Sequence, residues 1–196
     1  MIYDPYNQRW LAAAATEAES STSSILVGIS STSDPSGTWS LFKFDAGSNN
    51  RLWADYPTPG FNKNWVAVTV NMFRMPPVET FSQTRVFALN YPLLLTGVGS
   101  LTLFTGISDF AVQPAVAYSA TEETLYAPNH NSSGSANYRL NTITRTSASP
   151  VYTQGVLQTR TGGGWAKPSG NILPQQCLSN CPRPVAADRH RRLAHH

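Results

Sequence analysis

The chain of 196 residues is long enough for one domain with a hydrophobic core, and 41% of its residues are hydrophobic. Only 13% are charged, about half the usual share of a globular protein, so Ser, Thr, Asn, Gln and Gly must cover the surface. This composition favours an extracellular or cell-envelope β-protein over a cytosolic helical one. The net charge of +3 arises in residues 183–196, while basic and acidic residues balance before them. A nucleic-acid-binding protein would spread positive charge over a folded face, so we expect no nucleic-acid partner.

Membrane insertion is also not expected from the sequence. The longest apolar run, residues 92–107, is broken by Gly and Thr and falls short of the ~20 apolar residues of a spanning helix. The N-terminal residues lack the basic region of a signal peptide. If the protein is exported, we expect its signal to lie upstream of Met1.

Short β-strands separated by polar turns follow one another along the chain. Alternating apolar residues, such as Val66, Val68 and Val70, indicate one buried strand face. Only residues 90–97 suggest a short helical turn before Gly97. The pattern predicts an all-β propeller, sandwich or barrel. We expect strands over residues 9–15, 23–30, 38–45, 64–73, 84–91, 100–104, 113–119, 123–128, 138–144 and 150–157.

The stretch TSDPSGTW, residues 32–39, predicts a self-capped hairpin turn. The carboxylate of Asp34 can accept hydrogen bonds from the N–H groups of the turn that it begins, while Pro35 fixes φ at the next position. We expect Gly37 to take a left-handed conformation. Thr38 then starts the returning strand, and the ring of Trp39 packs beneath the hairpin.

These residues resemble the Asp-box, S/T-x-D-x-G-x-T-W, of sialidases and other β-propellers. Thr32, Asp34, Thr38 and Trp39 fall on its positions, whereas Ser36 stands where the box has Gly and Gly37 comes one place late. In that family the box is a structural hairpin on the propeller rim, away from the catalytic centre. The resemblance therefore implies a fold and not an activity.

A wider resemblance runs from about Tyr3 to Gln176. The segments YDPYNQRWLAAA, ILVGISSTSDPSGTWSLFKFD, LWADYPTPGFNKNWVAVTVNMF, VQPAVAYS and LPQQC are similar to a group of secreted bacterial β-propeller proteins of poorly defined function. The resemblance implies a partial propeller of about 2.5–3 four-stranded antiparallel blades, where closed propellers have 4–8. We therefore expect a blade domain over residues 1–176, an irregular basic tail over 177–196, and either remaining blades or a second copy as partner.

The loop around Asp55 is the best candidate ligand site. Trp53 and Tyr56 flank this carboxylate, and aromatic rings beside a carboxylate are suited to stacking on a sugar. The alternative is a structural turn that ends at Pro57, with its rings packed inside the blade. We predict a non-catalytic recognition or scaffold module for a glycan or protein ligand, with a sialidase-like glycoside hydrolase as the second hypothesis. Glycoside hydrolysis would need two carboxylates about 5–9 Å apart, which spacing along the chain cannot reveal.

Cofactor and metal chemistry have weak support. Cys177 and Cys181 form C-x₃-C, which favours a local disulfide in an oxidising compartment over a zinc site, with two unpaired thiols as the alternative. His130 is the only histidine before position 190, and there is no G-x-S-x-G nucleophile elbow. Gly162–Gly164 lack the Lys-Ser/Thr of a phosphate loop. We predict no cofactor, no metal and no catalytic residue.

Overall fold

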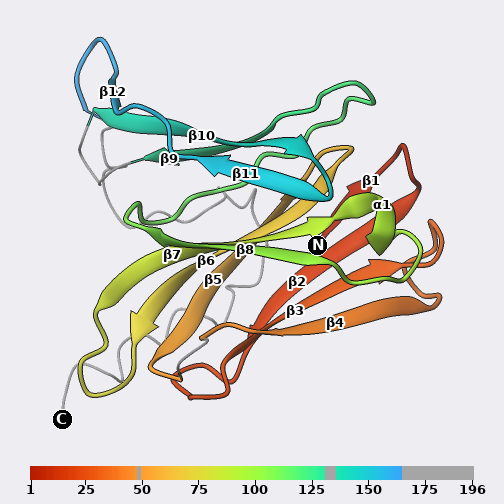
Figure 1. Ribbon diagram of the computed structural model, residues 1–196, viewed down its shortest axis with the longest axis horizontal. Helices are drawn as coiled ribbons and strands as arrows, with labels where there is room; N and C mark the ends of the chain where they lie inside the picture. Colours follow the sequence, from red (N-terminus) through yellow and green to blue (C-terminus); the bar gives the residue numbers. More distant parts are fainter. Residues whose placement is uncertain (48–49, 131–135, 165–196) are drawn as a thin grey trace, which may run out of the picture. The chain divides into compact units, whose positions relative to one another are not determined.

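The computed structural model describes residues 1–47, 50–130 and 136–164, all within the compact unit Met1–Trp165 (Figure 1). The predicted all-β class is confirmed, and the one helix described, α1, is a single short turn at the position expected from the sequence. The predicted domain boundary after residue 176 lies outside the described residues. The elements are β1 (Ile2–Asp4), β2 (Arg9–Thr16), β3 (Ser24–Ser30), β4 (Trp39–Asp45), β5 (Leu52–Phe61), β6 (Trp65–Arg74), β7 (Phe81–Asn90), α1 (Tyr91–Leu94), β8 (Leu101–Ile107), β9 (Leu125–His130), β10 (Asn137–Thr146), β11 (Ser149–Thr153) and β12 (Gln158–Thr159).

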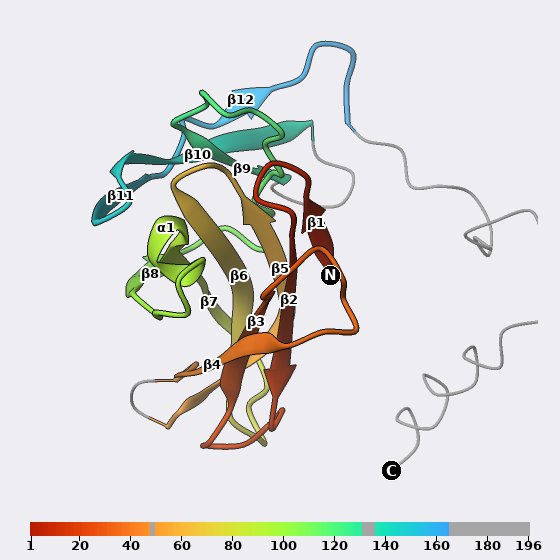
Figure 2. The same ribbon diagram turned by 90° about the vertical axis from the view of Figure 1, so that its right-hand side faces the viewer.

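The strands form three four-stranded antiparallel sheets. Sheet A has the order β1-β2-β3-β4 and sheet B the order β5-β6-β7-β8, so each is a simple meander of consecutive strands. In sheet C the central strand β10 pairs with β9 on one side and with β11 and β12 on the other. β2 lies beside β5 in both Figure 1 and Figure 2, which brings sheet A against sheet B.

The segment of residues 113–117 extends sheet C by one extended chain. The N–H groups of Gln113 and Ala115 donate to the carbonyls of Pro128 and Tyr126 on β9. On its other side the segment meets β5, where Phe61 and Val116 form a parallel bridge. Sheet C therefore begins with an edge segment followed by β9, β10 and β11, which is the same order of consecutive antiparallel chains as in sheets A and B.

Sheet B is buried on both faces because side chains of β6 alternate between two cores. Val66, Val68 and Val70 face sheet A, where they pack with Leu11 and Ile25. The opposite face of the sheet lies in a second core, formed by Trp65, Ala67, Val86, Ala88, Ile107, Val112, Leu125, Ala127 and Ile143. The period-two pattern read from the valines is thus correct, and the residues between them are buried as well.

Three strands were not foreseen from the sequence, namely β1, β5 and the two-residue β12. No strand was expected around Pro57, where a turn was one of two interpretations, but Pro57 lies inside β5, which passes it with a register shift between Asp55 and Thr58. Proline is tolerated there because β5 is the edge strand of its sheet and the bulge removes the need for a ladder hydrogen bond. β1 is too short, at three residues, to show an alternation in the sequence.

Candidate functional site

The hairpin between β3 and β4 is capped by its own side chains. Asp34 Oδ1 accepts hydrogen bonds from the N–H of Ser36 at 2.9 Å and from the Ser36 hydroxyl at 2.7 Å. These bonds hold the pKa of Asp34 below its ordinary value, and the bond from the Ser36 hydroxyl has the larger effect. Thr32 Oγ1 accepts from the N–H of Asp34, and the Thr38 hydroxyl donates to Ser31 Oγ. These contacts give the turn a structural role.

Two details of this hairpin differ from the sequence interpretation. Gly37 does not take a left-handed φ, so the expectation of a left-handed step there is wrong; its N–H instead donates to the carbonyl of Asp34 at 3.3 Å. The indole of Trp39 donates to the carbonyl of Pro35 at 3.0 Å, while its ring lies beside Gly28 on the neighbouring strand β3. The ring thus lies over sheet A.

Trp53, the first residue of the predicted ligand site, packs against other aromatic rings. Its ring stacks on Phe73 of β6 with 5.3 Å between the centroids. Phe73 also contacts Phe81 and Phe110 edge to face. The indole N–H of Trp53 is buried without a hydrogen-bond partner. This ring therefore supports the start of β5 more than it offers a free stacking surface.

Asp55 and Tyr56 are exposed at the bulge of β5. Asp55 Oδ1 accepts a hydrogen bond from the N–H of Tyr56 at 2.7 Å, and 58% of Tyr56 is exposed to solvent. Tyr56 has φ = 53°, a left-handed conformation that a tyrosine rarely adopts. Strained residues of this kind are common at ligand-binding sites. Asp55 and Tyr56 thus lie exposed together on the edge of sheet B, whereas the ring of Trp53 packs on Phe73.

Three turns of similar chemistry meet at the other end of β5. Each follows the first chain of a sheet, and each begins with a short polar side chain that accepts hydrogen bonds from N–H groups two or three residues later. Asp4 accepts from Tyr6 N–H at 2.9 Å in sheet A. Asn62 accepts from the N–H groups of Asn64 and Trp65, both at 3.0 Å, in sheet B. In sheet C, after the edge segment, Ser119 accepts from the N–H groups of Thr121 at 3.3 Å and Glu122 at 3.1 Å.

Direct contacts connect these three turns. The Tyr6 hydroxyl donates to the carbonyl of Tyr118 at 2.9 Å, and Lys63 forms an ion pair with Glu123 at 2.9 Å. A hollow of about 30 Å³ lies among them, lined by Asp4, Tyr6, Asn7, Phe61, Asn62, Lys63, Ala117, Ser119 and Ala120. The sequence interpretation missed this repeat. Its signal is an Asp, Asn or Ser placed a few residues before the second chain of each sheet.

Asp4 and Asp109, the two carboxylates buried among the described residues, form hydrogen bonds inside the fold. Asp4 also accepts hydrogen bonds from the Tyr91 hydroxyl at 2.6 Å and from the Asn7 amide at 2.7 Å. Asp109 accepts from Arg139 Nε at 3.1 Å and from the Gln154 amide at 2.9 Å. Both oxygens of each carboxylate therefore have partners, which is typical of structural acids rather than of a catalytic acid–base pair.

The remaining sequence expectations concern metals, cysteines and membranes. Within the described ranges, no group of three or more His, Cys, Asp or Glu residues could hold a metal ion. No helix among the described residues is long and apolar enough to cross a bilayer. His130 ends β9, while Cys177, Cys181 and Trp165 lie outside the described residues.

The chain matches no model of a protein family, and no curated protein or solved structure is significantly similar to it. The resemblance to secreted bacterial propellers therefore depends on the sequence segments quoted above.

Proposed function

We propose that sheets A, B and C are three blades of a β-propeller, and that the chain is a non-catalytic recognition or scaffold module of an exported protein. The observation that carries this proposal is the repeat at the end of β5. Three meanders of consecutive chains each turn after their first chain with Asp4, Asn62 or Ser119 as the accepting residue. A propeller is a radial repetition of such four-stranded meanders.

The ligand surface in this proposal is the exposed edge of β5 at Asp55 and Tyr56. Loops and edges at one face of a propeller commonly bind ligands, whereas the fold itself fixes no chemistry. Tyr56 offers an exposed ring for stacking on a sugar, and Asp55 offers a second carboxylate oxygen beyond the one bound to the Tyr56 N–H. We propose a carbohydrate as the ligand. The extracellular or cell-envelope location rests on the low content of charged residues.

A glycan array with the full chain tests this proposal, followed by calorimetric titration of any oligosaccharide that binds. We expect Tyr56→Ala to weaken binding ~5-fold or more, because stacking of a sugar on an exposed aromatic ring contributes about 1 kcal/mol. Tyr118→Ala is the matched control, since 57% of Tyr118 is exposed. We expect that variant to bind as the wild type does.

Hydrolysis of the same oligosaccharides distinguishes the second hypothesis. We expect no turnover, and no effect of Asp55→Asn on the background rate. Turnover that falls about a thousandfold in Asp55→Asn would be the signature of a catalytic carboxylate, and would replace the recognition module by a glycoside hydrolase. If no glycan on the array binds, the proposal that the ligand is a carbohydrate is wrong.

A further inference from the structure

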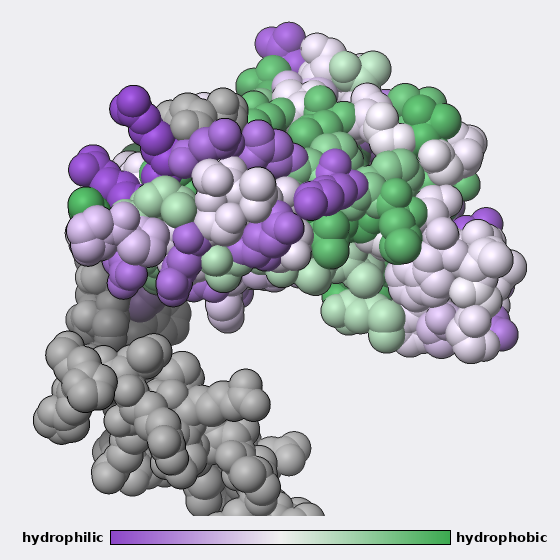
Figure 3. All heavy atoms as spheres, turned by 90° about the horizontal axis from the view of Figure 1, so that it is seen from below, coloured by the Kyte–Doolittle hydropathy of each residue, from purple (hydrophilic) through white to green (hydrophobic). Residues whose placement is uncertain are grey.

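We propose that two copies of the chain close on each other, with the outer face of sheet A in one copy packed on the outer face of sheet C in the other. This inference deepens the proposed function by naming the partner that completes the blades, and it rests on that assignment of blades. Its first support is the outer face of sheet A, the face turned away from sheet B. Figure 3 shows hydrophobic side chains gathered on the side of the molecule where β2, β3 and β4 lie.

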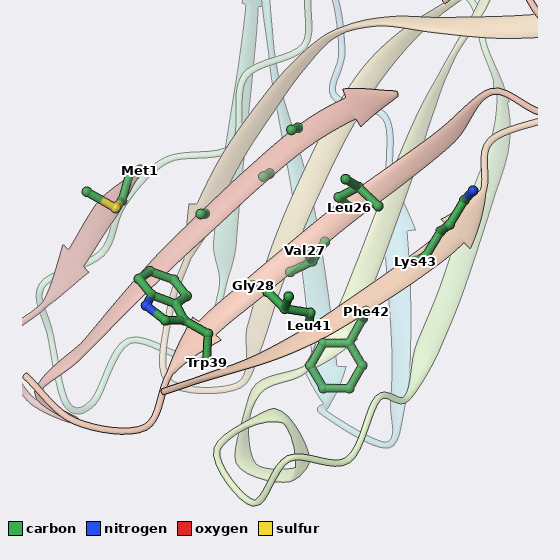
Figure 4. A pocket seen from close by; sticks show the side chains of 11 residues that line it. Met1, Leu26, Val27, Gly28, Trp39, Leu41, Phe42 and Lys43 are labelled. Atoms are coloured by element: carbon green, nitrogen blue, oxygen red, sulfur yellow. The ribbon is translucent and has the colours of Figure 1, made fainter. Parts of the chain in front are cut away.

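The outer face of sheet A is apolar and hollowed. Large side chains stand on β3 and β4, where Leu41 is 78% and Leu26 39% exposed (Figure 4). Between them the strands carry small residues, because Gly28 leaves room for the side chains of Leu41 and Trp39 beside it. A hollow of about 450 Å³ lies here, lined by Met1, Ala12, Ala13, Ala14, Leu26, Val27, Gly28, Trp39, Leu41, Phe42 and Lys43. Lys43 has the only charged side chain in this lining, and it pairs with Glu17 at 3.8 Å.

The outer face of sheet C presents large projecting side chains. Leu125, Ala127 and Ile143 point toward sheet B, so their neighbours on the same strands point outward. On that outward face Tyr126 is 38% and Leu140 48% exposed. Further residues of this face are Pro128, which pairs with Leu140 across the sheet, and Tyr138, which pairs with His130. The tyrosine rings and the leucine that project from the outer face of sheet C are thus complementary in shape to the hollow lined by small residues on the outer face of sheet A.

The contact between sheets B and C is an internal precedent for this packing. There sheet B contributes the small residues Ala67 and Ala88, and sheet C covers them with Leu125 and Ile143. All of these are buried, with exposures of 0 to 1%. The outer face of sheet A repeats the small residues at Ala12, Ala14 and Gly28 but has no covering sheet in the described part of the chain. A second copy would supply that covering sheet through Tyr126 and Leu140.

The number of sheets supports two copies as the assembly. Three sheets per chain give six in the pair, within the 4–8 blades of closed propellers. Each copy uses its sheet A face in one interface and its sheet C face in the other, so a twofold pair closes and leaves neither face open. Among the described residues of a single copy nothing covers either face, and contiguous apolar patches of this kind usually mark interaction surfaces.

Light scattering coupled to size-exclusion chromatography of the full chain, over a range of concentrations, measures the assembly. We expect twice the mass of one chain. Leu41→Asp on sheet A and Leu140→Asp on sheet C should each raise the dissociation constant ~100-fold or more, because each places a carboxylate in both interfaces of the pair. Val78→Asp is the matched control: Val78 is 53% exposed in the β6–β7 turn, and this variant should remain dimeric.

Mixing variants tests which faces meet. The pair Leu41→Asp with Leu140→Lys should form a mixed dimer more tightly than either variant forms with itself, because one interface is unaltered and the other joins opposite charges. A monomer at every concentration would overturn the proposal, as would a dimer sensitive to Leu41→Asp alone, or long open oligomers. Glycan binding by dissociated Leu41→Asp separates the two proposals, since recognition through Tyr56 does not require the second copy.

Discussion

Sheets A and B have the same topology but different surroundings, and the comparison explains what their sequences encode. Both are four-stranded meanders of consecutive strands. In sheet B the central strand β6 is buried along its first eight residues, because sheets A and C cover its two faces. In sheet A the described residues cover only the face toward sheet B, yet the opposite face also carries alanines and leucines. The sequence of sheet A is thus that of a sheet covered on both sides.

The largest difference should appear when the same substitution is made in each sheet. Leu89 of β7 is fully buried in the core between sheets A and B, whereas Leu41 of β4 is 78% exposed. We expect Leu89→Ala to lower the free energy of unfolding by about 2–5 kcal/mol through lost contacts and the cavity left behind. Leu41→Ala should change it by less than about 0.5 kcal/mol. Urea denaturation at a concentration at which the chain is monomeric measures both, and equal losses would mean that the outer face is covered within one chain.

The next largest effect concerns Gly60, where sheet B meets sheet C, compared with Gly37 in the hairpin of sheet A. A Cβ at Gly60 would collide with the carbonyl oxygens of Pro114 and Ala115, which are backbone atoms and cannot rotate away. We expect Gly60→Ala to cost about 1–3 kcal/mol, as overpacked cores do. At Gly37 the nearest atom, the carbonyl oxygen of Asp34, would be 3.4 Å away and φ is not left-handed, so Gly37→Ala should be tolerated. Thermal unfolding followed by circular dichroism compares the two, and a stable Gly60→Ala would contradict the tight contact with β5.

Two tyrosines with buried hydroxyls, Tyr91 and Tyr152, have a pH-dependent effect on stability. The Tyr91 hydroxyl donates to Asp4, whereas the buried hydroxyl of Tyr152 has no partner. Tyr91→Phe should therefore cost about 1–3 kcal/mol and Tyr152→Phe almost nothing. Burial raises the pKa of both hydroxyls above the ordinary 10, with further contributions from Asp4 at Tyr91 and from Asp109 at Tyr152.

The sign of this pH dependence follows from the raised pKa values. A hydroxyl that must stay protonated in the fold contributes its full stability below pH 10, and this is lost as the pH rises further. We expect the melting temperature to fall above pH 10, and to fall less steeply in each Phe variant. An unchanged slope in both variants would assign the alkaline loss to other groups.

The smallest effect is expected at Asp34, whose carboxylate is fully exposed in the hairpin of sheet A. Its pKa is lowered from 3.8 by the Ser36 hydroxyl and the Ser36 N–H. The stabilisation is therefore present above pH 3.8 and lost as the pH falls through the lower pKa of the folded state. Asp34→Asn should remove this acid dependence with little change at neutral pH. Carboxyl titration by NMR checks it, and an ordinary pKa for Asp34 would show that the turn bonds are not formed in solution.

How much of the fold and of the candidate site could be predicted depends on the length of the sequence pattern that encodes each part. Long alternating or apolar runs predicted β2, β3, β4, β6, β7 and β10, and the TSDPSGTW stretch predicted a hairpin. β5 was missed because Pro57, Pro59 and Gly60 are turn formers in isolation, and only the edge position and the bulge make them compatible with a strand. For the candidate site, no sequence rule separates Trp53, which packs on Phe73, from Tyr56, which faces solvent.

The two hydrogen bonds that tie the N-terminal turn to the rest of the molecule have a consequence for the order of folding. Each meander is made of neighbouring segments, so a sheet can form from contiguous chain at little entropic cost. The Asp4–Tyr91 bond, by contrast, spans 87 positions and the Tyr6–Tyr118 bond 112. During synthesis from the ribosome, β1 must therefore wait for residues made much later before its turn is secured. We expect the amide hydrogens of β1 to gain protection last in pulse-labelled refolding, although this strand is synthesised first.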